Sequence, residues 1–275
     1  METRLFVPPG HYYSPIVNPA ELRQRPPVQT DPRDTIAIDD LQMLALWESF
    51  RPFLEECLFP TTQEPGSRFY FENPFYSYAD AGVFYAMLRK YRPRRLIEIG
   101  SGFSSALVLD TAEQFLPNLE ITFIDPCPDD RLNNLLRPGD HARICIIKEP
   151  VQAVDLALFE TLEAGDLLFI DSTHVVKTGS DVCHEIFNIL PRLRSGVLIH
   201  FHDISYPFEY PTAWIYDENR SWNEIYLMRA FLMHNTAYRV VFFNGYFHAF
   251  HRDAIEGAWP PFLKNSGGAL WLAKN

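Results

Sequence analysis

Short apolar runs alternate with helix-like stretches over most of the chain, and this alternation constrains the fold more than any other feature. The runs predict strands at 95–99, 121–125, 143–148, 167–171, 197–202, 239–243 and 269–272. Helices are predicted between them, at 78–91, 104–115, 129–136, 151–163, 179–193 and 222–234. Nearly continuous apolar strands are typical of a parallel sheet covered on both faces. The pattern predicts a doubly wound α/β fold whose ligand lies at the carboxyl ends of the strands.

The first 78 residues differ from the rest because they hold 11 of the 22 prolines. One helix is predicted there, over 38–59, where apolar residues recur about every 3.6 positions after an aspartate start. The rest of this region shows no sustained alternation of apolar and polar residues. We expect residues 1–78 to form an N-terminal extension, a cover or lid, over a domain formed by residues 79–275.

The overall charge and the cysteines narrow the class of protein. The net charge is −11, which argues against nucleic acid, whose partners present Lys/Arg patches. No apolar run approaches 18 residues, so no membrane partner is expected. The four cysteines lie far apart in the sequence, and their spacing does not match that of zinc-binding motifs. Cys145 and Cys183 are expected to be buried thiols. A soluble cytoplasmic protein is predicted, with its oligomeric state left open.

The loop after the first predicted strand carries a glycine-rich turn, in "RLIEIGSGFSSALVLD". Gly100, Ser101 and Gly102 are followed by a helix near Ser104 whose free N–H groups can face a ligand. Dinucleotide folds have a third glycine where this chain has Ser105, and they place a ribose-binding carboxylate where Asp125 ends the next strand. Asp125 suits NAD and S-adenosylmethionine equally. Glu98, two residues before the first glycine, favours S-adenosylmethionine, whose amino group and sulfonium require acceptors.

Several stretches together resemble the class I S-adenosylmethionine-dependent methyltransferases, and more specifically the methyltransferase-24 family. The motifs are "IEIGSGFSS", "FIDP", "LLFIDSTHVVKTGSDV" and "HFHDISYPFEYP", joined by "PPGHYYSP" near the start and "WNEIYLMRAFLMHN" later. The resemblance covers most of the chain. It implies a Rossmann-like sheet of seven strands, in which the last strand is antiparallel and lies beside the sixth.

The resemblance also implies a set of cofactor-binding residues for S-adenosylmethionine. The glycine-rich turn would line the methionine part, Asp125 would hold the ribose, and Gln152 would lie near the adenine. The full predicted set is Glu98, Gly100, Ser101, Gly102, Ser104, Asp125, Gln152 and Asp171.

The ends of the fourth and fifth predicted strands carry the acid–base groups. In the methyltransferase sheet these two strands are neighbours, so Asp171, His174, His202 and Asp203 are expected to form one catalytic cluster. His200 shares a face with His202 but lies deeper in the strand, and a structural role is predicted for it. His202 is expected to act as a base, since a neutral imidazole can accept an alcohol proton near pH 7. A divalent metal on Asp171, His202 and Asp203 is the alternative, with carboxylates suiting magnesium and histidines suiting iron, manganese or zinc.

Aromatic stretches flank this cluster in the sequence. Tyr76, Tyr206, Tyr210, Trp214 and Trp222 are predicted to bind the acceptor. "GHYYSP" is expected to fold over the cofactor and shield it from water. The predicted function is O-methylation of a small molecule or saccharide. Two alternatives remain open: an iron-dependent hydroxylase or oxygenase on the same scaffold, and a non-catalytic S-adenosylmethionine-binding protein.

Overall fold

A seven-stranded sheet forms the centre of the molecule in the computed structural model, which describes residues 5–28 and 30–275. Its strands are β1 (Arg95–Ile99), β2 (Glu120–Ile124), β3 (Ile144–Ile147), β4 (Leu167–Ile170), β5 (Leu198–Phe201), β6 (Tyr238–Phe243) and β7 (Leu270–Lys274). The order is β3-β2-β1-β4-β5-β7-β6, and β7 runs antiparallel to both of its neighbours. The predicted fold class and the position of the antiparallel last strand are confirmed.

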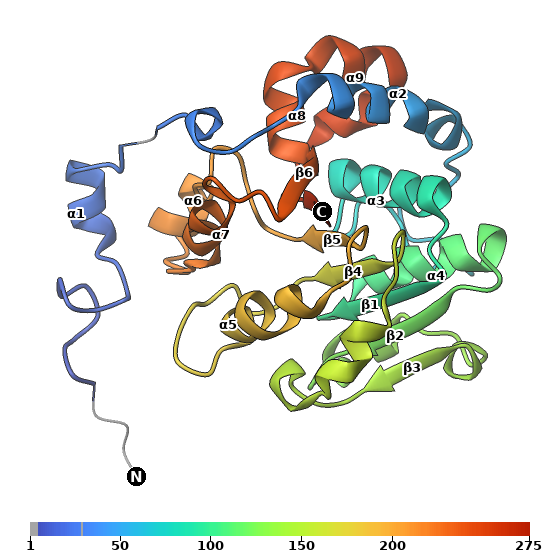
Figure 1. Ribbon diagram of the computed structural model, residues 1–275, viewed down its shortest axis with the longest axis horizontal. Coiled ribbons are helices and arrows are strands. Elements are labelled where there is room, and N and C mark those ends of the chain that lie inside the picture. The colour runs from blue at the N-terminus through green and yellow to red at the C-terminus, as the bar shows by residue number, and fades with distance from the viewer. Residues whose placement is uncertain (1–4, 29) are drawn as a thin grey trace.

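Two long helices lie within one residue of their predicted bounds and cover one face of the sheet. Helix α3 (Tyr78–Tyr91) is buried along most of its length, and α4 (Phe103–Phe115) packs beside it (Figure 1). Helix α5 (Asp181–His184) lies on the opposite face (Figure 1) and continues as a π-helical turn, Glu185–Ile189, and a 3-10 turn, Leu190–Arg192. The predicted helix 179–193 is therefore a composite of three helix types.

Two predicted helices are wrong. Residues 129–136 form only short 3-10 turns, Pro128–Asp130 and Leu132–Asn134, and residues 151–163 form Val151–Ala153 and Leu156–Thr161. In the second case Val154 is extended, and the Asp155 side chain accepts from the N–H of Ala157, which starts a new turn. A side chain that caps the backbone locally competes with a continuous helix.

The N-terminal region contributes a helix to the core. Helix α2 (Asp40–Glu55) corresponds to the predicted helix, and its buried Trp47 packs against Phe242, Phe247 and Phe262. Helices α8 (Asn244–Phe250) and α9 (Arg252–Ala258), which the sequence did not predict, gather beside α2 at one end of the sheet (Figure 1). The boundary at residue 78 stays a prediction, and residues 1–4 and 29 of the extension lie outside the described residues.

A buried ion cluster ties the segment before α3 to the domain. The guanidinium of Arg68 donates to Asp110 at 2.5 Å and to Asp140 at 2.5 Å and 2.8 Å. All three side chains are less than one-tenth exposed. Since buried charges are stable only when paired, this cluster fixes how the chain enters α3.

Four of the six remaining elements bury at least one side chain. The six are α1 (Pro19–Gln24), α6 (Thr212–Tyr216), α7 (Glu224–Leu232) and the 3-10 turns Pro32–Asp34, Asp140–Ala142 and Pro260–Lys264. Cys145 is exposed rather than buried, because β3 is an edge strand, and Cys183 is only partly buried. Within the described part of the chain, no helix combines the length and the apolar character that crossing a membrane would require.

Candidate active site

The carboxyl ends of β1, β4 and β5 meet at one edge of the sheet. Hydrogen bonds continue one step past each strand, from Asp171 N–H to the carbonyl of Ile99 and from His202 N–H to the carbonyl of Ile170, both at 2.9 Å. They fix the backbone where the polar residues begin. The chain then turns sharply, since His174 and Asp203 have left-handed φ values of 60° and 57°. Non-glycine residues held in this conformation are uncommon, and they cluster at functional sites.

The glycine-rich turn lines a first cavity of about 270 Å³, which we call the cofactor cavity. Gly100 has a φ of +78°, and a methyl group there would overlap the carbonyl oxygen of Asp171. Only glycine therefore allows the first and fourth strand ends to approach this closely. The hydroxyl of Ser101 donates to Asp125 at 2.5 Å, which holds that carboxylate beside the turn. The lining residues are Gly100, Ser101, Asp125, Cys127, Arg131 and Asp171.

Glu98 and Ser104 lie beneath this cavity rather than in its wall. The Ser104 hydroxyl donates to Glu98 at 2.5 Å, and the Glu98 side chain is fully buried. Burial raises the pKa of Glu98 to about 8, so the side chain is mainly protonated at neutral pH. Ser105, at the position of the missing third glycine, accepts from the N–H of Gly102 at 3.0 Å. Gln152 donates to the carbonyl of Gly179 and is absent from the cavity wall, so its contact with adenine stays a prediction.

A second cavity of about 420 Å³ adjoins the first, and we call it the reaction cavity. Asp171 and Arg131 line both cavities. Its wall holds all four predicted catalytic side chains, together with two of the predicted aromatic residues. The lining residues are Pro74, Phe75, Arg131, Asp171, Ser172, Thr173, His174, His202, Asp203, Trp214, Arg220 and Trp222.

His174 is held by carboxylates on both of its ring nitrogens. Nδ1 lies 2.8 Å from Glu224, while Nε2 lies 3.3 Å from Asp171 and 3.5 Å from Asp203. Burial lowers the pKa of His174, but the bonds to Asp171 and Glu224 outweigh it and hold the pKa well above 6.5. His174 is therefore an imidazolium that orients the two strand-end aspartates.

Glu185 adds a buried acid behind this group. Burial raises the pKa of Glu185 well above its usual range, and the neighbouring Glu224 raises it further. Ser172 donates to Glu185 at 3.2 Å. The π-helical turn that carries Glu185 is a feature often found at functional sites.

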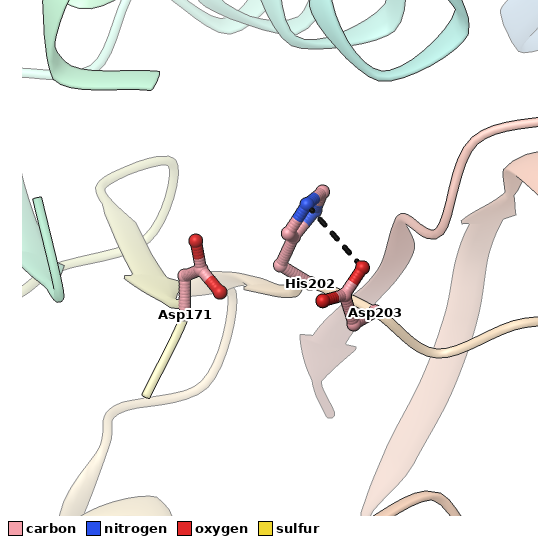
Figure 2. A group of neighbouring side chains, drawn as sticks. All are labelled: Asp171, His202 and Asp203. Atoms are coloured by element: carbon pink, nitrogen blue, oxygen red, sulfur yellow. Dashed lines mark ion pairs between the residues drawn. The ribbon is translucent and has the colours of Figure 1, made fainter. Parts of the chain in front are cut away.

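His202 presents the freer imidazole. Figure 2 shows Asp171, His202 and Asp203 at the adjacent strand ends, with His202 Nε2 3.6 Å from Asp203. Each of the three offers a ligand atom within 4.8 Å of the others, so the donor set fits a divalent cation. Burial lowers the pKa of His202, and Asp203, Asp171 and Asp80 together outweigh it, so the net shift is upward.

His200 lies in the core, as its depth in the strand predicts. Its ring stacks on Phe169 at 4.0 Å and meets Trp271 edge-on at 4.6 Å. Burial lowers the pKa of His200 well below 6.5, which keeps the ring neutral. Neither ring nitrogen has a hydrogen-bond partner among the described residues.

The predicted acceptor residues separate into two groups. Trp214 and Trp222 line the reaction cavity, and Tyr210 lies next to them, 6.0 Å from Trp222 between ring centroids. Tyr76 is buried under His202, with ring centroids 5.1 Å apart, and so lies behind the cavity wall. Tyr206 packs on Tyr246 and Phe250 of α8, away from both cavities, because the chain turns toward β6 there.

The predicted cover of the cofactor is not formed by "GHYYSP". Tyr12 and Tyr13 are 82% and 65% exposed, and neither they nor His11 lines the cofactor or the reaction cavity. In this structure His11 and Tyr12 instead line a shallow surface pocket beside α1.

Sequence reasoning missed four charged residues near the site: Arg131, Glu185, Arg220 and Glu224. Glu224 begins α7 and pairs with His174, while Arg229 of the same helix donates to Thr30. The two arginines stack on aromatic rings, Arg131 on Phe75 and Arg220 on Trp214. The only local signals in the sequence were the glutamate at the start of the apolar helix α7 and the aromatic residues around Arg220.

Comparisons with known proteins agree with this arrangement. A family model described as a methyltransferase domain matches residues 97–204, the segment that carries β1 to β5 and most of both cavity walls. A protein of Archaeoglobus fulgidus, described as uncharacterized, is 37% identical over 165 residues, which are 57% of this chain and 73% of the relative.

Similar solved structures are much more distant. The SAH-bound methyltransferase PaMTH1 of Podospora anserina is 14% identical over 88% of this chain and 91% of its own, with a TM-score of 0.45. An SAH complex of an O-methyltransferase from Bacillus cereus is 12% identical over 88% of this chain and 94% of its own, with a TM-score of 0.44. Similarities this remote carry no argument about substrate or mechanism. Residues 97–204 of this chain therefore match a methyltransferase domain, and the sheet around them has the strand order of the class I methyltransferase fold.

Proposed function

We propose that the protein transfers the methyl group of S-adenosylmethionine to an oxygen atom of a small molecule or saccharide. The observation that carries this proposal is that Asp171 lines both the cofactor cavity and the reaction cavity. A methyl donor in one cavity and an acceptor in the other would meet at this residue. When bound, S-adenosylmethionine supplies a methyl group already activated by its sulfonium.

The residues of the cofactor cavity match the polar groups of this donor. The Asp125 carboxylate suits the ribose hydroxyls, and the backbone of Gly100 and Ser101 can approach closely. Arg131 offers a cation for the carboxylate of the methionine part. Glu98 and Ser104 would support the turn from below rather than touch the cofactor. Gln152 stays in the proposed set only as a residue near the adenine.

Within the reaction cavity, His202 is the group best placed to accept the acceptor's proton. Both nitrogens of His174 already face carboxylates, so His174 positions Asp171 and Asp203 rather than taking up a proton. His202 lines the cavity and has Asp203 on one side, 3.6 Å away, to stabilise the imidazolium that forms. Because its pKa is raised, a base role predicts turnover that rises with pH through that pKa.

A divalent metal is the second candidate for activating the acceptor, favoured by the ligand set of Asp171, His202 and Asp203. A bound cation would lower the pKa of a coordinated hydroxyl. The imidazolium of His174, however, already supplies a positive charge between the two aspartates. This favours the base mechanism.

Transfer of tritiated methyl from S-adenosylmethionine to a panel of alcohols, phenols and glycosides tests the proposal. We expect an O-methylated product, and we expect His202→Ala to lower turnover by about 10²–10⁴-fold, the usual contribution of a general base. The dissociation constant for S-adenosylhomocysteine should change little. Full turnover by His202→Ala would remove His202 from the mechanism, and a product methylated on carbon would remove the proposed acceptor class.

A further inference from the structure

A third cavity of about 290 Å³ lies between the N-terminal extension and the elements that precede α7. Its outer side is formed by Pro15, Val17, Leu22 and Pro27, within a segment that we call the strap, residues 15–27. Its inner side is aromatic, formed by Tyr210, Trp214, Trp222 and Tyr226 together with Ile215. We call this space the strap cavity.

The strap cavity and the reaction cavity share one wall. Trp214, Arg220 and Trp222 line both spaces. The two indoles meet edge-on, with centroids 5.5 Å apart, and the Arg220 guanidinium lies 3.9 Å from one ring and 4.6 Å from the other. The two cavities therefore adjoin at this stacked group, and the reaction cavity also holds His202 and Asp203.

The strap is fixed by polar contacts at the surface rather than by a core of its own. The N–H of Val17 donates to Ser221 at 3.3 Å, and Arg23 pairs with Asp217 at 3.1 Å. Helix α1, inside the strap, has no buried residue. Because exposed ion pairs stabilise by at most about 1 kcal/mol, the strap can open to admit a ligand.

We infer that the strap cavity binds a planar apolar ring of the methyl acceptor while the acceptor's hydroxyl lies in the reaction cavity. This inference rests on the proposed function and names its substrate class. An engineered apolar cavity of about 150 Å³ holds a benzene, so this one has room for two fused rings. Aromatic walls favour a planar ring through stacked and edge-to-face contacts.

Binding of 2-naphthol, a planar bicyclic molecule with one hydroxyl, tests the inference by fluorescence titration of the full chain with S-adenosylhomocysteine present. We expect saturable binding at one site. Leu22→Asn should weaken it about tenfold, the effect of losing about 50 Å² of apolar contact with the ring. Trp214→Leu should weaken it as well, on the opposite wall.

Leu58→Asn is the matched control, because Leu58 is 87% exposed and lies outside this cavity. It should bind 2-naphthol as the wild type does. Absence of saturable binding, or unchanged affinity in both Leu22→Asn and Trp214→Leu, would overturn the inference. Calorimetry with S-adenosylhomocysteine on the same samples tests the proposed function separately. If the wild type does not bind S-adenosylhomocysteine, the proposed function is wrong, whereas the titration with 2-naphthol still tests the strap cavity.

Discussion

Glu98 offers the sharpest quantitative prediction because a fully buried carboxyl lies directly under the cofactor turn. Its pKa rises from 4.5 to about 8 through burial, and Ser104 is its hydrogen-bond donor. Since one pKa unit corresponds to about 1.4 kcal/mol, the folded state prefers the protonated form by about 5 kcal/mol relative to the unfolded chain. Glu98→Gln copies the neutral acid in shape and removes the ability to ionise.

The sign of the pH dependence follows from the direction of the shift. A carboxyl whose pKa is raised on folding stabilises the protein fully below about pH 4.5, and that contribution is lost as pH rises to about 8. The wild type should therefore lose about 1.4 kcal/mol of unfolding free energy per pH unit from this group, whereas Glu98→Gln should not. The variant should be the more stable protein by about 4 kcal/mol near pH 7.5.

Urea unfolding followed by tryptophan fluorescence at pH 5.5, 6.5 and 7.5 measures this difference. Glu149→Gln, on an exposed glutamate, is the control and should follow the wild type at every pH. Parallel curves for the wild type and Glu98→Gln would show that Glu98 is ionised in the folded protein and refute the reasoning. The affinity of Glu98→Gln for S-adenosylhomocysteine should stay close to that of the wild type, because the side chain lies beneath the cavity.

Three further predictions concern the ion clusters and the metal. In EDTA, Glu224→Gln should lower the free energy of unfolding by about 2–3 kcal/mol, because it breaks a buried charged pair with His174. Glu185→Gln should lower it by less than about 1 kcal/mol, since burial already keeps that acid neutral. Equal losses of the two variants in urea unfolding would contradict the charged pair. Calorimetric titration with Mn²⁺ should show no saturable binding in the micromolar range at the strand ends, and tight binding would favour the metal mechanism. Arg68→Met should lower the free energy of unfolding by about 3–5 kcal/mol, because its ion pairs are buried. Arg137→Met should lower it by less than about 1 kcal/mol, because the ion pairs of Arg137 are more exposed. Similar shifts in melting temperature for the two variants would contradict the importance of burial.

The sheet was predictable from the sequence because each buried strand is a short apolar run. All seven predicted strands lie within two residues of the observed bounds. The 3-10 turns after β2 and β3 were not predictable, since local caps such as Asp155 decide them against a permissive helix pattern. Helices α8 and α9 were missed because they are short and follow β6 directly.

The part of the site that lies at the ends of the parallel strands was predictable from the sequence. Asp171, His174, His202 and Asp203 come together because parallel strands place their carboxyl ends at one edge. Tyr206 does not join them, because the direction of a loop depends on tertiary contacts with α8. The role of Glu224 was not predictable, because its partner His174 is 50 residues away and only the folded chain brings the two together.

Cofactor binding tests the central claim most directly. Calorimetry should show one site for S-adenosylmethionine and S-adenosylhomocysteine and none for NAD. Asp125→Asn should weaken both by about tenfold, the effect of exchanging a charged for a neutral acceptor at the hydroxyls of the ribose. Preferential binding of NAD, or no binding of either S-adenosyl compound, would contradict the account.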